Sequence, residues 1–388
     1  MNNGLIIFSG AVETLEFFSK QLAIEYEKDG YEIFTYKINE DEKQINDIKK
    51  FISSHKITLL TFNFIGLSGE SFLKENGNSI FSLYEMKKIV ILVDHPIYYH
   101  DQLVEAKSDI TLYCVDEDHV SYIEKYYPQI LNIQYMPLAG TELSKSIKIF
   151  EEKKIPLLFT GNYVPKERLL TYLDCMEQDY KNFYHEIVED FIAHPNQSLQ
   201  YGIEKRLNDM FPEASNSEIA EAMHGMLFID LFIRSYFRAK IVQTIADANI
   251  PIYLVGKDWN YLETKNPDCI RVLGNGFENT MFCLEKMKNA RLSLNVMPWF
   301  KRGFHDRIPS SMLQRAVCIT DGSQYIDRNF RDGHDLILFN LEEIQDLPTI
   351  INEKANNIEE LKIIARNGYK KAKSKHTWKE RYLILKNN

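Results

Sequence analysis

Short apolar runs alternate with helical patterns along most of the chain, and this alternation constrains the fold more than any other feature of the sequence. The run Lys88–Asp94 contains five consecutive apolar residues, which is typical of a strand buried on both faces of a parallel sheet. Apolar residues recur at helical spacing over 15–26, and Asp29-Gly30 ends this pattern, as a glycine commonly ends a helix. Strands that alternate with helices predict βαβ units, parallel sheets and right-handed crossovers.

The expected strands fall into two series. The first is Leu5–Phe8, Tyr31–Tyr36, Ile57–Phe62, Lys88–Asp94, Ile110–Val115 and Leu131–Tyr135. The second is Leu157–Thr160, Pro251–Val255, Ile270–Leu273, Ala290–Asn295, Val317–Asp321 and Leu336–Phe339. Each series can build one parallel sheet, so we expect an α/β fold with two halves. Ligands bind outside the carboxyl ends of the strands in doubly wound sheets, so two facing halves would hold a ligand in the cleft between them.

A polar stretch separates the two series. A length of 388 residues fits two domains. Residues 141–155 are polar and charged and precede Pro156, so they are the expected linker. We therefore place the domains at 1–150 and 156–375.

The second half contains a long acidic stretch, 165–247, whose apolar residues have helical spacing. We interpret this stretch as a helical insertion, which Pro195 and Pro212 break into about three or four helices. Because it is foreign to a plain α/β domain, it is also the expected acceptor or partner surface. We further expect two helices in 341–388, with 376–388 packing back on the first domain.

Composition excludes several classes of function. The formal charge of −9 argues against nucleic-acid binding, which needs clustered Lys and Arg. The cysteines are odd in number and form no C-x-x-C pair, so we expect reduced thiols rather than a zinc ribbon or a disulfide framework. We find neither a signal peptide nor a long apolar span, and a cytoplasmic protein is the expectation. The cysteines are Cys114, Cys175, Cys269, Cys283 and Cys318.

Two polar residues, Asp94 and His95, follow the expected central strand of the first half. A carboxylate or an imidazole at a strand end can act as a general base near neutral pH. The alternative is a loop in which Asp94 caps the next helix and His95 is a surface residue. The residues alone leave both possibilities open.

The segment 295–307 is the most unusual stretch of this acidic chain. Lys301, Arg302, His305 and Arg307 cluster just ahead of a helix expected near Pro309. Positive side chains and free helix N–H groups together predict an anion site for a phosphate or diphosphate. The alternative is a solvated basic loop capped by the intervening Asp306.

Two further loops follow strands of the second half. Lys257 follows one strand after Gly256 and could contact a phosphate. Gly276 and Phe277 follow another, in a G-x-G turn that lacks the full dinucleotide-binding pattern. Phe277 could contact a nucleobase, whereas the alternative is a tight turn without a ligand. No metal-binding spacing occurs among the ten histidines.

Residues 291–381 resemble the C-terminal domain of GT-B-fold glycosyltransferases, specifically the group related to the spore-maturation protein CgeB. The matching residues are Asn295, Gly303–Arg307, Met312, Val317–Asp321, Ser323–Tyr325, Phe330–Gly333, the Asn367–Tyr369 turn and His376–Arg381. The rest of the chain matches only as α/β halves with an Asp-His-Pro at a strand end. The resemblance implies a GT-B fold, in which two Rossmann-like parallel-sheet domains face each other across a cleft.

The resemblance also implies a function. Members of this family transfer a sugar from a nucleotide-diphosphate donor, here a UDP- or GDP-sugar, without a metal. The acceptor would be a hydroxyl of a glycan, protein or lipid, and His95 or Asp94 would deprotonate it. The donor-binding residues would come from the second half: Arg307, Lys257, His305, Gly276, Phe277, Ser310, Ser311 and Asp321.

The chain departs from the family pattern at two positions. Related enzymes usually carry a Glu three residues after the arginine, where it binds the donor ribose, and this chain has Ser310. Ser310 and Ser311 keep hydroxyls that can bond a ribose without charge. The small Gly expected five residues later is Arg315. A non-catalytic, two-domain protein that binds a sugar or nucleotide is therefore the alternative function.

Overall fold

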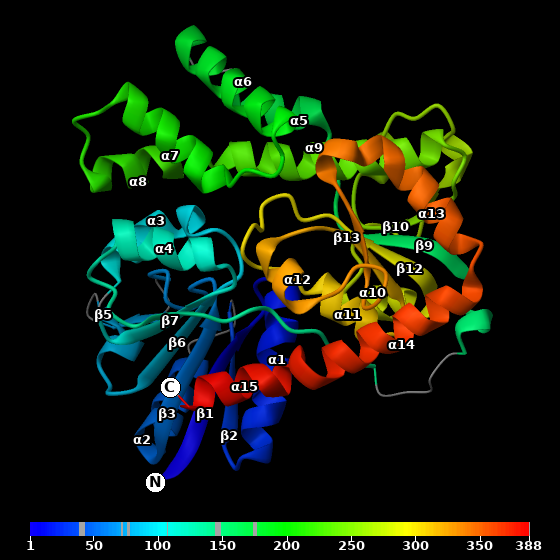
Figure 1. Ribbon diagram of the computed structural model, residues 1–388. Helices are drawn as coiled ribbons and strands as arrows, with labels where there is room; N and C mark the ends of the chain where they lie inside the picture. The colour runs from blue at the N-terminus through cyan, green and yellow to red at the C-terminus, as the bar shows by residue number, and fades with distance from the viewer. Residues whose placement is uncertain are drawn as a thin grey trace. The chain divides into compact units, whose positions relative to one another are not determined.

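The computed structural model describes residues 1–38, 43–70, 73–75, 78–106, 108–143, 149–173 and 177–387 (Figure 1). They form two compact units, each built on one parallel sheet. The first unit is Met1–Leu138 with Trp378–Asn388, and the second is Ala139–Thr377. Cys175 and part of the expected linker lie outside the described residues, whereas the other four cysteines are free thiols.

The sheet of the first unit has the strand order β2-β1-β3-β6-β7-β8, and all of its pairs are parallel. Because β1 lies between β2 and β3, the winding direction reverses there. The strands are β1 (Asn2–Ser9), β2 (Glu32–Lys37), β3 (His55–Phe62), β6 (Lys87–Leu92), β7 (Ile110–Cys114) and β8 (Ile133–Tyr135). The helices between them are α1 (Glu13–Lys28), α2 (Lys43–Ser54), α3 (His100–Glu105) and α4 (Glu117–Tyr126).

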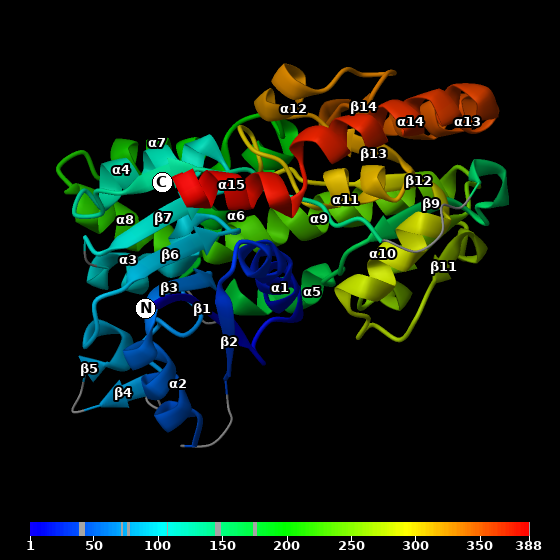
Figure 2. The same cartoon turned by 90° about the horizontal axis from the view of Figure 1, so that it is seen from below.

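Two smaller pieces complete this unit. The short hairpin of β4 (Lys74–Glu75) and β5 (Asn78–Ser79) lies near α2 (Figure 2). Phe81, which follows the hairpin, is fully buried in one apolar cluster with Ile48 and Ile52 of α2. The last helix, α15 (Trp378–Asn387), packs on α1. The rings of Trp378 and Phe18 lie 4.9 Å apart, so aromatic contacts hold the end of the chain on the first unit.

The sheet of the second unit has the order β11-β10-β9-β12-β13-β14, again with parallel pairs only. Its winding direction reverses between β9 and β12, the arrangement of a dinucleotide-binding α/β sheet. The strands are β9 (Ile155–Thr160), β10 (Ile252–Val255), β11 (Ile270–Val272), β12 (Ala290–Asn295), β13 (Val317–Asp321) and β14 (Ile337–Phe339). The helices after β11 are α10 (Thr280–Asn289), α11 (Arg307–Leu313), α12 (Gln324–Asn329), α13 (Leu347–Ala355) and α14 (Ile358–Lys375).

The described part of the insertion contains more helices than the sequence predicted. They are α5 (Lys166–Leu170), α6 (Gln178–Ala193), α7 (Leu199–Met210), α8 (Asn216–His224) and α9 (Leu227–Asp247). Pro195 and Pro212 lie in the breaks before α7 and α8, as predicted, but α8 also ends at Gly225, where α9 soon begins. A capping box of Ser215 and Glu218 starts α8.

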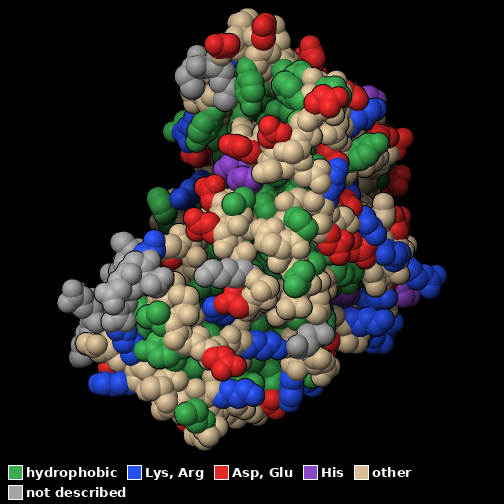
Figure 3. All heavy atoms as spheres, turned by 90° about the vertical axis from the view of Figure 1, so that its left-hand side faces the viewer, with side chains coloured by type: hydrophobic (Ala, Val, Ile, Leu, Met, Phe, Trp, Pro, Cys, Tyr) green, Lys and Arg blue, Asp and Glu red, His purple; other side chains and the backbone are tan. Residues whose placement is uncertain are grey.

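Helix α9 is the helix of the insertion on which others pack. Helices α5 and α6 both pack on it, and α7 contacts α6 and α8 (Figure 1). Acidic and hydrophobic side chains are mixed on the surface at the top of Figure 3, where α6, α7 and α8 lie. Tyr201, Met210 and Phe211 are at least half exposed there.

Two expectations for the end of the chain are wrong. The region 341–388 holds three α-helices, α13, α14 and α15, rather than two. The expected turn at Asn367–Tyr369 lies inside α14. A Cβ on Gly368 would stand 2.5 Å from the Asp335 carbonyl oxygen, so this glycine allows close packing of the helix rather than a turn. In the described ranges, every helix is too short or too polar to span a bilayer.

Candidate active site

Arg307, the first residue of α11, lies where the strand order of the second sheet reverses. Its Nη1 donates to the Thr160 carbonyl oxygen at 2.6 Å, at the end of β9, and its Nη2 to the Val296 carbonyl oxygen at 3.4 Å, just after β12. A Cβ on Gly161 would stand 2.9 Å from Nη1, so the glycine leaves room for the guanidinium. The arginine is 7% exposed and joins the two strand ends at which a doubly wound sheet binds its ligand.

His305 lies in contact with Arg307. The backbone N and the Nε of Arg307 lie 3.2 and 3.3 Å from His305 Nδ1, and Asp306 Oδ1 lies 2.7 Å from the same nitrogen. Burial, together with the charge of Arg307, lowers the pKa of His305 to about 4. The imidazole is therefore neutral at pH 7, and its Nδ1 lies between the Arg307 donors and the Asp306 carboxylate.

Asp321, at the end of β13, is the third member of this group. It is 2% exposed, and its Oδ1 accepts from the Met297 backbone N–H at 2.8 Å. Its Oδ2 is buried and makes no hydrogen bond within the described part of the chain. Burial raises the pKa of Asp321 to about 6, because an ionised carboxylate loses its hydration there.

A second group of expected residues comes together at the ends of β10 and β11. Lys257 Nζ lies 4.5 Å from the centre of the Phe277 ring, and Lys257 Cγ would be 3.2 Å from a Cβ on Gly276. Gly276 has a φ of 90°, which suits the tight turn that aims Phe277 outward. Phe277 is 80% exposed, so its ring is available to stack on a planar ligand.

The two serines lie deeper than the sequence suggested. Helix α11 is buried over its whole length, and Ser311 donates its hydroxyl hydrogen to the Ile308 carbonyl oxygen at 2.9 Å. Ser310 is 5% exposed, and a Cβ on Gly140 would stand 2.6 Å from its backbone nitrogen. A ribose contact from Ser310 or Ser311 stays a prediction.

Sequence analysis missed three arginines that line a cavity of about 390 Å³ in the second unit. We call it the arginine pocket. Arg168 comes from α5, and Arg234 and Arg238 come from α9. Asp230, Arg234 and Arg238 recur every four residues, which places them on one face of the helix. That spacing is visible in the sequence and could have revealed the pocket.

Only part of the positive charge in the arginine pocket is neutralised. Arg234 forms a two-pronged ion pair with Asp230, with Nη2 to Oδ2 at 2.6 Å and Nε to Oδ1 at 2.9 Å. Arg168 Nη1 lies 2.8 Å from Asp258 Oδ2. Within the described residues Arg238 has no carboxylate partner and donates only from Nη1, to the Asn162 carbonyl oxygen at 3.1 Å.

The environment of Arg238 favours an anion. Its Nε is buried and bonds no acceptor within the described ranges. Burial and the charges of Arg307 and Arg234 lower the pKa of Arg238, and the carboxylate of Asp230 offsets this in part, although a guanidinium stays charged. The Trp299 ring covers Arg234 and Arg238, at 4.3 and 5.2 Å from its centre. Because Arg238 is partly buried and its charge is only partly offset, a bound anion would stabilise this arrangement.

The first unit places Asp94 and His95 in different surroundings. Asp94 Oδ2 accepts from Asn63 Nδ2 at 3.1 Å and from the Tyr99 hydroxyl at 3.4 Å. His95 is 8% exposed, and its Nδ1 accepts from the Ile97 backbone N–H at 3.1 Å. His95, rather than Asp94, therefore caps the short helix that follows, and the alternative of a surface histidine is wrong.

Asn63, at the end of β3, is a polar residue that the sequence analysis passed over. Its Oδ1 accepts from the Val93 backbone N–H at 3.0 Å, while its Nδ2 holds Asp94. Asn63 and Phe64 have φ angles of 52° and 57°, which L-residues rarely adopt. Strained backbone of this kind is commonly found at functional sites, and here it directs the Asn63 amide toward Asp94.

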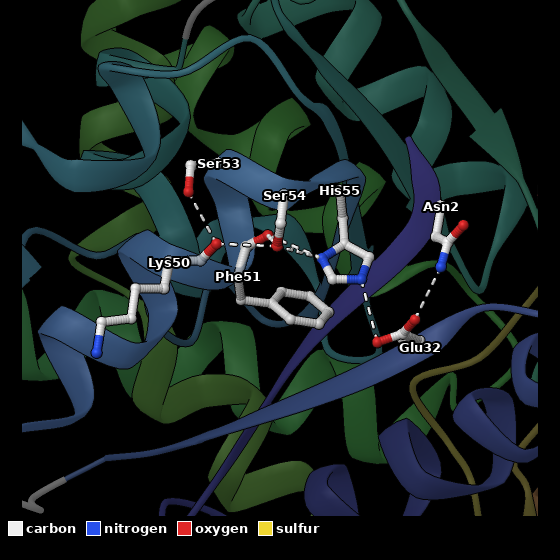
Figure 4. A network of polar contacts seen from close by, with 7 residues as sticks. All are labelled: Asn2, Glu32, Lys50, Phe51, Ser53, Ser54 and His55. Atoms are coloured by element: carbon white, nitrogen blue, oxygen red, sulfur yellow. Dashed lines mark hydrogen bonds and ion pairs between the residues drawn. The ribbon is translucent and has the colours of Figure 1, made fainter.

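A Ser-His-Glu cluster at the opposite end of the first sheet is structural (Figure 4). The Ser54 hydroxyl donates to the Lys50 carbonyl oxygen at 2.9 Å, so its hydrogen is engaged by α2. His55 Nδ1 lies 3.0 Å from the Phe51 carbonyl oxygen, which requires an N–H, and Nε2 lies 3.1 Å from Glu32. Ser54 Oγ also lies 2.9 Å from His55 Nδ1, but an Nδ1–H that donates to the Phe51 carbonyl oxygen cannot accept the serine proton, so His55 ties the end of α2 to β2.

The ranges that the structure describes contain no group of three or more His, Cys, Asp or Glu side chains placed to hold a metal ion. The polar atoms available to a ligand are instead guanidinium, amide and carboxyl groups at the carboxyl ends of the two sheets. In the second unit these groups surround the reversal between β9 and β12. Such a position fits an anionic ligand.

Comparison with protein families agrees with this geometry. Residues 234–386 match the model of a family described as glycosyl transferase-like. This part of the chain is a glycosyl transferase-like domain. The match begins inside α9 at Arg234, includes Arg238 and Arg307, and ends inside α15. Comparison with curated proteins gives no match.

Solved structures share the fold over the full length of the chain. Sucrose-phosphate synthase from Thermosynechococcus elongatus has a TM-score of 0.55 at 9% identity, covering 99% of this chain and 98% of its own. HepE from Anabaena, in complex with UDP and glucose, has a TM-score of 0.55 at 10% identity, covering 100% and 99%. A glycosyltransferase from Rickettsia africae has 0.54 at 8%, covering 100% and 97%. The expected GT-B fold is thereby confirmed.

Proposed function

We propose that this protein transfers a sugar from a nucleotide-diphosphate donor to a hydroxyl acceptor. The observation that carries the proposal is Arg238 in the arginine pocket, which has no carboxylate within ion-pair distance among the described residues and lies inside a glycosyl transferase-like domain. A diphosphate supplies the anion that this pocket lacks, and it is also the leaving group whose negative charge grows during transfer.

The donor-binding site is proposed at the carboxyl edge of the second sheet. Asn162 links its two parts, because its carbonyl oxygen accepts from Arg238 and its Oδ1 accepts from the Lys257 backbone N–H at 2.9 Å. The diphosphate would lie against Arg234 and Arg238, and the nucleobase against Phe277. The complexes of HepE with UDP and with UDP-glucose make UDP-sugars the first donors to test, followed by GDP-sugars.

Arg307 takes a different role in this proposal from the one expected from the sequence. Its guanidinium is engaged by the carbonyl oxygens of Thr160 and Val296. It therefore positions the ends of β9 and β12 and adds long-range positive charge, without direct contact with the diphosphate. Neutral His305 supports it, and buried Asp321 holds the backbone after β12 through the Met297 N–H.

Asp94 is the proposed general base, and the first unit is the proposed acceptor-side domain. The acceptor oxygen would attack the anomeric carbon while the bond from that carbon to the diphosphate oxygen breaks. The hydroxyl proton would pass to Asp94, and the nucleoside diphosphate would leave with the negative charge. Asn63 and Tyr99 orient the carboxylate for this step. A glycan, protein or lipid acceptor, independence from metal and a cytoplasmic location stay predictions.

The test is a donor panel with the purified full chain. UDP-glucose, UDP-N-acetylglucosamine and GDP-mannose are incubated with and without cell extract as the acceptor source, and release of UDP or GDP is measured. The proposal expects release from at least one donor and its loss in Asp94→Asn. Release by wild type that persists unchanged in Asp94→Asn would remove Asp94 from the mechanism.

A non-catalytic binding protein is the second candidate, and one observation favours it. Ser310 stands where related enzymes carry a ribose-binding Glu, and it is 5% exposed. The donor contact that the family obtains from that position is therefore weakened in this chain. Binding of UDP or GDP without turnover of any donor in the panel would establish this candidate instead.

A further inference from the structure

A second cavity, of about 310 Å³, lies in the second unit beside the arginine pocket. Both cavities are lined by Val164, Leu169 and Ser235. The Ser235 hydroxyl donates to the Val164 carbonyl oxygen at 2.6 Å and accepts from the Val164 N–H at 3.2 Å, which fixes this shared wall. We call the second cavity the tyrosine pocket, because Tyr163, Tyr236 and Tyr261 line it.

The charges of the tyrosine pocket balance. Lys166 and Lys240 contribute two positive charges, and Glu167 and Glu263 contribute two negative charges. The arginine pocket, in contrast, has an excess of positive charge, because Arg238 has no carboxylate within ion-pair distance among the described residues. A neutral ligand with many hydroxyl groups suits a balanced set of donors and acceptors better than an anion does.

The aromatic rings of the tyrosine pocket are braced. Trp259 is 1% exposed and stacks on Tyr163, with ring centres 5.4 Å apart and planes 25° apart. Tyr261 is 54% exposed, and the guanidinium of Arg168 lies 5.0 Å from its ring centre. A rigid ring with one face covered offers its other face to the C–H face of a sugar ring, at little cost in side-chain entropy.

A fixed amide completes the set of groups that a sugar would use. Gln243 Nε2 donates to the Glu263 carbonyl oxygen at 3.1 Å, which leaves Oε1 and the second N–H of the amide for ligand hydroxyls. We propose that the tyrosine pocket binds a neutral pyranose ring, stacked on Tyr261 and hydrogen-bonded to Gln243. If the pyranose belongs to a glycan, this site goes beyond the proposed transfer reaction; if it is the sugar of the donor, the site rests on that proposal. In both cases binding is measured without turnover.

The pyranose could belong to a glycan or to the sugar of a nucleotide donor. The experiment therefore uses two kinds of probe on the full chain. Maltotriose, cellotriose and chitotriose are titrated at millimolar concentration by ligand-observed NMR, and UDP-glucose and UDP are titrated by calorimetry. The variants are Tyr261→Ala and Gln243→Leu, and Tyr201→Ala is the control because Tyr201 is 65% exposed on α7.

Two results support the proposal. If the pyranose comes from a glycan, at least one trisaccharide binds wild type, and both variants lose about tenfold in affinity for it while the control does not. If it comes from the donor, both variants lose affinity for UDP-glucose and keep their affinity for UDP. If neither the trisaccharides nor UDP-glucose distinguish the variants from the control, the tyrosine pocket is not a sugar site. Failure of the transfer reaction would instead appear as absent turnover.

Discussion

Arg307 Nη1 donates a hydrogen bond of 2.6 Å to the carbonyl oxygen of Thr160, across the point where the second sheet reverses its winding direction. A charged donor on a strand-end carbonyl is one of the stronger hydrogen bonds that a protein makes. The bond holds the carboxyl edge of the sheet in place. Gly161 and Asn162 follow β9 at this edge, and Trp299 lies in the loop after β12. The site therefore rests on a contact made by an arginine that the sequence marked as a ligand residue.

Replacing Arg307 should destabilise the second unit. Arg307→Ala removes hydrogen bonds to two buried carbonyl oxygens and should lower the free energy of unfolding by about 2–3 kcal/mol. Arg307→Lys should recover only part of this loss, because one ammonium group does not reproduce the guanidinium fork. Urea unfolding measures both, with Arg366→Ala on the exposed face of α14 as the control. A loss in Arg307→Ala no larger than in the control would contradict the stabilising role of these two hydrogen bonds.

Arg238 should show the opposite effect on stability. Arg238 is partly buried and has no carboxylate within ion-pair distance among the described residues, so Arg238→Met should leave the free energy of unfolding unchanged or raise it by about 1 kcal/mol. The same variant should lose affinity for nucleotide diphosphates, as expected where a binding site is kept at the expense of stability. Thermal or urea unfolding without ligand measures the first effect. A strong destabilisation would mean that Arg238 serves the fold.

Asp321 and His305 should give the stability opposite dependences on pH. The pKa of Asp321 rises from 3.8 to about 6 on folding, so its contribution of about 3 kcal/mol is present at low pH and is lost as pH rises through about 6. The pKa of His305 falls from 6.5 to about 4, so its contribution is present above about pH 6.5 and is lost as pH falls toward 4.

The two contributions oppose each other between about pH 4 and pH 6.5, so together these two groups should add little net pH dependence to wild type there. Asp321→Asn should make stability rise more steeply with pH across that window, and His305→Gln should make it fall. Urea unfolding of the three proteins at several pH values separates the effects. Parallel curves for wild type and Asp321→Asn would show that the Asp321 pKa is not raised.

Arg315 should prefer a glycine in its place over an alanine. Its φ is 55°, just after α11, which is the left-handed position that a glycine favours at the end of a helix. Both Arg315→Gly and Arg315→Ala lose the contact of the guanidinium with Tyr369, at 4.0 Å from the ring centre. The Gly variant should therefore be more stable than the Ala variant by about 1 kcal/mol. Equal stabilities of the two variants would show that the positive φ causes no backbone strain at this residue.

Asn63 should matter for turnover through Asp94. Asp94→Asn should lower the rate of transfer about 10²- to 10⁴-fold, as expected for loss of a general base, with the donor affinity unchanged. Asn63→Ala should lower the rate by less and shift its pH profile, because the amide that orients Asp94 is lost. His95→Ala should instead lower stability. A wild-type pH profile in Asn63→Ala would show that the bond to Asp94 has no catalytic role.

Much of the fold could be predicted because the strands are continuous apolar runs. Ala290–Asn295 and Val317–Asp321 were predicted with the bounds that β12 and β13 have. Gly368 misled the prediction, because a glycine needed for close packing inside a helix has the same sequence signature as a turn. Arg315 shows the reverse, a non-glycine residue at a left-handed position.

The candidate site was harder to predict than the fold. Lys257, Gly276 and Phe277 follow strands and come together as the strand-end rule suggests. Arg234 and Arg238 lie within a long helix, where charged residues are usually solvated, and only tertiary packing shows that they line a cavity. The role proposed for Arg307 also differs from the one predicted from the sequence, because sequence spacing does not show which backbone carbonyl oxygens a buried side chain reaches.

Calorimetric titration of UDP and GDP into the wild-type protein and Arg238→Met tests the central claim most directly. The account predicts that wild type binds at least one of these nucleotides and that Arg238→Met binds it about 10- to 100-fold more weakly, the effect of losing a charge-assisted bond. Arg366→Ala should bind as wild type does. Equal affinities for wild type and Arg238→Met, or no binding of either nucleotide to wild type, would contradict the account.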